Sequence, residues 1–130
     1  MIEKGADVDA TDENGRTPLM DAIMEGLAAL LIDRGANKEA TDKSGNTALH
    51  VALDYGRKEI SLLLVERGAR IMSVNKFGRT PLHYAANKGM TEVASCMIEK
   101  GADVDATDEN GRTPLMDAIM EGLAALLIDR

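Results

Sequence analysis

The side chains with the greatest capacity for chemistry in this sequence are two histidines, one cysteine and a run of carboxylates. His50 and His83 lie 33 residues apart and would serve as a pair of metal ligands or as a general base. Cys96 is the single cysteine and would be the nucleophile of a thiol enzyme. The acidic stretch DVDATDENG, which begins at Asp7, looks like a calcium loop because calcium prefers carboxylate oxygens.

The acidic stretch does not have the spacing that calcium binding requires. A calcium loop needs glycine at its sixth position and a distal Glu, but Asp12 is sixth from Asp7 and the glycine comes at Gly15. The chain also lacks the phosphate-binding G-x-x-x-x-G-K-[ST] motif, H-E-x-x-H and G-x-S-x-G. The serines are few, and no base is arranged with them. The sequence predicts a protein that is not an enzyme and needs no metal and no cofactor.

The net charge of −7 argues against a nucleic-acid partner, because an acidic chain repels phosphate groups. Residues 5–34 and 101–130 each carry −5, residues 35–67 are neutral and residues 68–100 carry +3. No apolar run reaches the ~20 residues of a membrane-spanning helix, and the N-terminus lacks the layout of a signal peptide. A single cysteine fits a reducing compartment. We expect an intracellular, cytoplasmic protein without a membrane partner.

An internal repeat organises the whole chain as one array over residues 1–130. Each unit begins with a Gly-Ala pair, continues through a polar turn and ends in an apolar segment; the units span approximately 5–34, 35–67, 68–100 and 101–130. Two units have 33 residues and two have 30. Residues 97–130 repeat residues 1–34 letter for letter.

The segment GRTPLHYAANKG at 78–89 resembles the helix start of an ankyrin repeat. GNTALHVALDYG departs from that pattern at Ala48, and GRTPLMDAIMEG has Met20 where the family has His. The resemblance covers essentially the whole chain and implies an all-α solenoid of helix-turn-helix units with short β-turn tips. It also implies histidines that bond within their own turns and a non-catalytic scaffold that binds a protein partner.

The residues themselves favour the same architecture. Thr80 can cap a helix that Pro81 begins, and the turns DENG, DKSG and NKFG have the Asx and Gly that a type I turn prefers. The second helix then carries a narrow apolar stripe, formed by Ile60, Ser61, Leu64 and Val65 in one unit and by Val93, Ala94, Met97 and Ile98 in the next. Cys96 aligns with leucines and belongs to the core. Such a small stripe is not stable alone, so each unit must stack on its neighbours.

The two copies of PLMDAIMEGLAALLIDR, which begin at Pro18 and Pro114, lack three residues that correspond to 57–59. In one interpretation, each copy keeps a cramped turn, at Gly26 and at Gly122, before a short second helix. In the other, the deletion joins the two halves into one continuous helix.

The continuous amphipathic helix would span 18–33 and, in the second copy, 114–129, since apolar residues recur there at helical spacing. Its second half could not fold back on its own unit, so it would pair with another chain by domain swapping. Units cut within their second helix would also leave apolar faces open. The sequence leaves both interpretations open and predicts self-association through Met24, Gly26, Leu27, Met120, Gly122 and Leu123.

The leading prediction is a protein-protein interaction scaffold that binds its partner through the turn tips and the exposed side of the first helices. The predicted contact residues are Glu13, Arg16, Lys43, Asn46, Asp54, Tyr55, Lys76, Phe77, Arg79, Asn87 and Lys88. Phe77, at a turn tip between Lys76 and Arg79, is the first choice for an anchor, and Tyr55 is the second. Packing of either ring against its neighbours is the competing interpretation.

Overall fold

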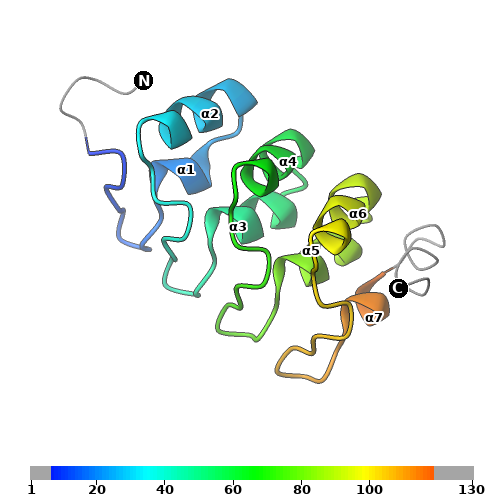
Figure 1. Ribbon diagram of the computed structural model, residues 1–130. Helices are drawn as coiled ribbons and strands as arrows, with labels where there is room; N and C mark the ends of the chain where they lie inside the picture. The colour runs from blue at the N-terminus through cyan, green and yellow to red at the C-terminus, as the bar shows by residue number, and fades with distance from the viewer. Residues whose placement is uncertain (1–6, 119–130) are drawn as a thin grey trace.

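The computed structural model describes residues 7–118 of the chain and contains seven α-helices in that range. Their bounds are α1 (Pro18–Asp21), α2 (Glu25–Asp33), α3 (Ala48–Asp54), α4 (Lys58–Glu66), α5 (Pro81–Asn87), α6 (Thr91–Glu99) and α7 (Pro114–Asp117). The inner helices α1, α3, α5 and α7 form one row, the outer helices α2, α4 and α6 form a second, and the turns project to one side (Figure 1). The described part of the chain contains no strand, so the predicted all-α solenoid is confirmed.

The helices α3 and α5 begin with a reciprocal cap between a threonine and a histidine. The Thr47 hydroxyl accepts the N–H of His50 at 3.4 Å, and Nδ1 of His50 accepts the N–H of Thr47 at 3.1 Å. Thr80 and His83 form the same box at the start of α5. These bonds satisfy backbone donors that have no partner inside the helix.

The core lies between the two rows of helices and is aliphatic. Every member of the predicted apolar stripe is buried: Ile60, Ser61, Leu64, Val65, Val93, Ala94, Met97 and Ile98. The inner helices α1, α3 and α5 each pack against the inner helix of the next unit, and each also packs against the outer helix of its own unit. The apolar faces of one unit are therefore covered largely by its neighbours, as the small size of each stripe predicts.

Successive turns are joined by backbone hydrogen bonds. The N–H groups of Lys43, Lys76 and Glu109 donate to the carbonyls of Asn14, Ser44 and Phe77, respectively, at 3.0, 3.0 and 2.9 Å. Glycine is needed where the turns touch: Gly78 has a φ of +74°, and a Cβ there would lie 2.9 Å from the backbone nitrogen of Glu109. The turns consequently form a continuous edge of the array, in which each turn is hydrogen-bonded to the next.

The first unit corrects both interpretations of its three-residue deletion. α1 has four residues where α3 and α5 have seven, whereas α2 keeps the nine residues of α4 and α6. The missing residues are thus lost from the end of the first helix, and the chain reverses at Ala22–Met24, where both end residues are extended. The continuous helix over 18–33 is wrong, and Gly26 lies inside α2 and not in the turn.

Core packing explains why the second helix keeps its length. Ala28 and Leu31 are fully buried at positions equivalent to Ser61 and Leu64, and one continuous helix would carry them away from that core. In the second copy the helix also ends early, because Asp117 is its last residue and the next residue is extended. The continuous helix over 114–129 is therefore also wrong; Met120, Gly122 and Leu123 lie outside the described residues.

Arg57 compensates for the shortened α1. Its Nη1 donates to the carbonyls of Met20 at 3.3 Å and Ala22 at 3.1 Å, which the missing helical turn would otherwise have used. Arg57 directly precedes α4, at the position that Met24 occupies before α2, so the second unit caps its truncated neighbour. The sequence analysis did not assign this role to Arg57.

The position of Gly26 predicts a gain in stability when it is replaced by alanine. Gly26→Ala should raise the free energy of unfolding by about 0.5–1 kcal/mol, because a Cβ there meets nothing within 4 Å and alanine favours helix. Gly56→Ala is the matched control: Gly56 aligns with Gly26 in sequence but has a φ of +70°, so alanine should destabilise. Chemical denaturation measures the free energy of unfolding of both variants. A loss of stability in Gly26→Ala would contradict the placement of Gly26 inside α2.

Candidate interaction surface

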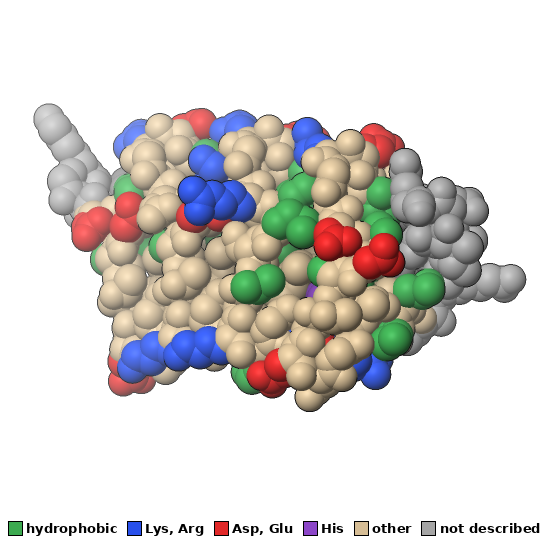
Figure 2. Space-filling model, turned by 60° about the horizontal axis from the view of Figure 1, so that its bottom comes forward, with side chains coloured by type: hydrophobic (Ala, Val, Ile, Leu, Met, Phe, Trp, Pro, Cys, Tyr) green, Lys and Arg blue, Asp and Glu red, His purple; other side chains and the backbone are tan. Residues whose placement is uncertain are grey.

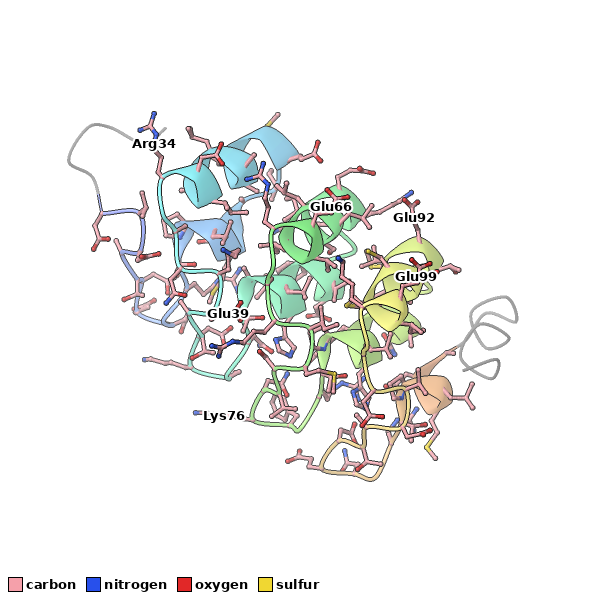
Figure 3. All side chains as sticks on the ribbon, in the orientation of Figure 1. Arg34, Glu39, Glu66, Lys76, Glu92 and Glu99 are labelled. Carbon is pink, nitrogen blue, oxygen red and sulfur yellow. The ribbon has the colours of Figure 1, made fainter. Side chains whose placement is uncertain are left out.

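The predicted contact residues occupy the turns and the inner helices, but they differ in exposure. Eight are exposed and three are partly buried: the exposed ones are Glu13, Lys43, Asp54, Tyr55, Lys76, Phe77, Asn87 and Lys88, and the others are Arg16, Asn46 and Arg79. Lys76 points away from its turn, whereas Glu66, Glu92 and Glu99 lie on the outer helices (Figure 3). The turns and inner helices thus present a face separate from that of the outer helices.

Side chains at the end of α3 and α5 form the most exposed part of this face. Tyr55 is 58% exposed, and its ring stacks on the guanidinium of Arg57, whose carbon lies 4.9 Å from the ring centre. Asp54 on α3 faces Lys88 of the next unit, with 3.9 Å between Oδ1 and Nζ. Tyr55 is therefore held by a cation on one side and remains open to a partner on the other.

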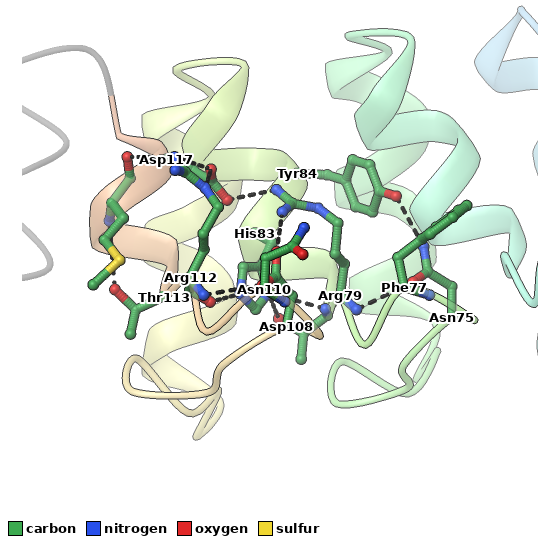
Figure 4. A network of polar contacts seen from close by, with 12 residues as sticks. Asn75, Phe77, Arg79, His83, Tyr84, Asp108, Asn110, Arg112, Thr113 and Asp117 are labelled. Atoms are coloured by element: carbon green, nitrogen blue, oxygen red, sulfur yellow. Dashed lines mark hydrogen bonds and ion pairs between the residues drawn. The ribbon is translucent and has the colours of Figure 1, made fainter.

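Arg79 braces two units instead of facing solvent. Its Nη1 and Nη2 lie 2.6 Å from Asp108 and 2.5 Å from Asp117, respectively, and its guanidinium lies over the ring of Tyr84 (Figure 4). Arg112 shares the carboxylate of Asp117 at 2.9 Å. Both terminal nitrogens of Arg79 are thus engaged within the chain, which leaves this side chain less available to a partner.

The carboxyl of Asp108 is kept ionised by its surroundings. Burial by itself would raise its pKa, but the N–H groups of Arg112 and Asn110 and the guanidinium of Arg79 donate to it. Together these bonds hold the pKa of Asp108 below its usual value. The ion pair with Arg79 is consequently present at neutral pH.

One unit earlier, the equivalent positions form a network of uncharged hydrogen bonds in place of these ion pairs. Nδ2 of Asn75 donates to Oδ1 of Asn46 and to the hydroxyl of Tyr84, both at 2.8 Å. Asn46 corresponds to Arg79, and Asn75 and Tyr84 lie 29 and 38 positions further along, as Asp108 and Asp117 do from Arg79. Here Asn75 bonds to both other residues, whereas Arg79 bonds to both carboxylates. In both units, the residue types at these spacings can form hydrogen bonds or ion pairs with one another. The sequence analysis missed this signal.

Both histidines have structural roles, and each joins two units. Nδ1 accepts within the helix cap, while Nε2 of His50 donates to the carbonyl of Arg79 at 3.0 Å and Nε2 of His83 donates to that of Arg112 at 2.8 Å. The predicted bond within the turn is present, and the bond to the next unit is additional. With both ring nitrogens occupied, neither histidine can act as a ligand or base.

The other groups with a capacity for chemistry are not brought together within the described residues. Between residues 7 and 118, no three His, Cys, Asp or Glu side chains are grouped to hold a metal ion. Cys96 is partly buried and packs against the core, as predicted. The hollow beside His50 and Tyr55 holds only about 60 Å³, well below the roughly 300 Å³ at which small-molecule sites begin.

The repeated helix pairs, the stacked turns and the capping histidines agree with a family match found for the sequence. The profile described as "Ankyrin repeats (3 copies)" matches residues 1–75 and 68–129. This chain belongs to the ankyrin repeat family. Ankyrin repeats generally serve as protein-protein interaction modules. A search of curated proteins found no match, and none of the described helices has the length and apolar character needed to cross a membrane.

The burial of His50 predicts a loss of stability in mild acid. Burial lowers its pKa below 6.5, so the unfolded chain binds the proton more tightly than the folded chain. The stabilisation is complete above pH 6.5 and decreases as the pH falls toward the lower folded-state pKa.

The variant His50→Met isolates this effect, because Met20 fills the equivalent position of the first unit and is buried there. Below pH 6.5 the free energy of unfolding, measured by chemical denaturation, should decrease more steeply with falling pH for the wild type than for His50→Met. Identical slopes throughout would contradict a neutral, buried His50.

Removal of Arg79 should destabilise the array by about 2 kcal/mol, because two buried carboxylates lose a charged donor. Arg16→Ala is the matched control: Arg16 occupies the equivalent position but pairs with Asp21, whose side chain is largely exposed. Its loss should cost less than about 1 kcal/mol. Urea denaturation of the Arg79→Ala and Arg16→Ala variants measures the loss of unfolding free energy in each. Equal losses would contradict the stronger, buried ion pairs of Arg79.

Proposed function

We propose that the face formed by the turns and the inner helices α3 and α5 binds a segment of a partner protein, with Tyr55 and Phe77 as anchors. The observation that carries this proposal is the exposure of these two rings. Only 2% of the residues are aromatic, yet Tyr55 and Phe77 are 58% and 47% exposed. Large aromatic side chains contribute most of the binding energy at interfaces when a partner covers them.

The surroundings of the two rings support the same function. Asp54 precedes Tyr55 in the chain and pairs with Lys88, and Lys76 precedes Phe77, so charged groups flank each apolar anchor. Seen from the side to which the turns project, hydrophobic side chains reach the surface in separate places among charged ones (Figure 2). The tied turns and packed helices hold these groups in place, which reduces the entropy lost on binding.

Self-association is a second function that the sequence predicts. Domain swapping through a continuous helix is no longer supported, because α2 packs on α1 of its own unit and on α4 of the next unit. Met24 is 68% exposed, while Gly26 and Leu27 are also open to solvent. Contact between chains through these residues stays a prediction, and it is separate from the partner-binding face.

Photo-cross-linking tests the proposed face. A photoreactive phenylalanine analogue is placed at Tyr55 in one variant and at Glu66, on the outer helix α4, in another. In extracts of cells that express the protein, the probe at Tyr55 should capture a specific protein and the probe at Glu66 should not.

Affinity for the captured protein gives the decisive comparison. Tyr55→Ala and Phe77→Ala should each weaken binding at least tenfold, about 1.4 kcal/mol, while each variant keeps a cooperative thermal unfolding transition. Glu66→Ala should bind like the wild type. If both alanine variants keep full affinity, or if only the Glu66 probe captures the partner, the proposed face is incorrect.

A further inference from the structure

One loop of the array differs in chemical character from its equivalents in the other units. Residues 68–79 contain three cations and no carboxylate, whereas residues 5–16 and 101–112 each contain four carboxylates and one cation. The equivalent loop at 35–46 contains two of each. All four loops occupy corresponding positions in the same array, so the difference is not required by the fold.

The changes concentrate at three alternate positions, 70, 72 and 74. Arg70 stands where the other units have Asp7, Asn37 and Asp103; Met72 stands where they have Asp9, Glu39 and Asp105; and Val74 stands where they have threonine at 11, 41 and 107. Met72 and Val74 are 43% and 59% exposed. Polar and acidic positions have thus become an exposed apolar strip that begins with a cation.

The replacement at position 72 weakens a structural contact. In the earlier units, a carboxylate accepts a backbone N–H of the next unit: Asp9 from Asn37 at 2.8 Å and Glu39 from Arg70 at 2.9 Å. Met72 offers only its sulfur to the N–H of Asp103, at 3.3 Å. A thioether is a much weaker acceptor than a carboxylate. Stability therefore does not explain the presence of methionine at this position.

The strip borders an open hollow and carries a cation with no ion-pair partner. Arg70, Ile71, Met72, Ser73 and Val74 line a hollow of about 550 Å³. Among the ion pairs of residues 7–118, none involves Arg70. An occupant that fits must therefore bring apolar side chains to Met72 and Val74 and a carboxylate to Arg70. None of these residues belongs to the face proposed above.

We propose that the strip formed by Arg70, Met72 and Val74 is a second docking site, which binds an extended protein segment with apolar residues beside a carboxylate. The charge supports this occupant, because Arg70 and Met72 stand where the first and last units have aspartates, and Arg70 forms no ion pair within residues 7–118. An acidic segment is repelled by the loops at 5–16 and 101–112, which carry four carboxylates each, while the loop at 35–46 has no net charge. This site does not depend on the binding face that contains Tyr55.

The chain supplies its own control for the test. The variant Arg70→Asn/Met72→Glu/Val74→Thr gives the strip the residues that the second unit has at the same positions. Its melting temperature should equal or exceed that of the wild type, because Met72→Glu restores a carboxylate acceptor for the N–H of Asp103. A clear drop in melting temperature would show that the strip serves the fold, and would overturn the proposal.

Peptide selection measures the binding itself. A phage-displayed library of random peptides is selected on the wild type and counter-selected on the triple variant. The expected peptides combine apolar residues with Asp or Glu, and bind the triple variant at least tenfold more weakly than the wild type. Tyr55→Ala should leave their affinity unchanged, so this result stands or falls independently of the face that contains Tyr55.

Three outcomes would overturn the proposal. Selected peptides that bind the triple variant as well as the wild type would show that the strip is not a site. Enrichment of Lys and Arg in place of Asp and Glu would reject the proposed chemistry. Binding of anionic phospholipid vesicles or single-stranded RNA that the triple variant abolishes would assign the strip to a lipid surface or a nucleic acid.

Discussion

The bond from each histidine to the next unit is the contact on which the order of the array depends. Nε2 of His50 reaches the carbonyl of Arg79, so one imidazole both caps its own helix and fixes the turn of its neighbour. The backbone bonds between successive turns repeat that connection at the tips. Because no unit can bury its own apolar stripe, each of these bonds keeps together surfaces that are stable only when stacked. The exposed anchors, in turn, keep fixed positions only because the turns are tied.

Identical sequence acquires different environments at the two ends of the described structure. Leu19 and Met20 are 2% and 1% exposed beneath α3, whereas Leu115 and Met116, their exact repeats, are 40% and 59% exposed. The burial of the two equivalent aspartates is reversed. Asp117 is buried by Arg79 from the preceding unit, while Asp21 pairs with Arg16 of its own unit. In a solenoid, the neighbours of a residue decide its burial as much as its type does.

The repeat, the helix starts and the buried stripe could be predicted because they depend on local residue patterns. Thr80 and Pro81 signal a helix start wherever they occur, and the alternation of apolar residues indicates which side is buried. For Tyr55 and Phe77 the sequence left exposure and packing against a neighbour as alternatives, and the structure shows both rings exposed. The role of Arg79 was not predicted: its position suggested an open contact, but two carboxylates 29 and 38 residues away engage its guanidinium. Long-range partners of this kind follow from stacking geometry, which a single unit does not contain.

The sequence alone determined the family, the aliphatic core and the positions of the turns, because each depends on residues close together in the chain. Only the tertiary structure decided how the shortened first unit folds. Its local pattern suits a continuous helix equally well, but burial of Ala28 and Leu31 against the second unit keeps α2 at full length and shortens α1 instead. Arg57, from the second unit, then caps the carbonyls that this leaves free. The deciding contacts come from another unit, so the local sequence could not have revealed them.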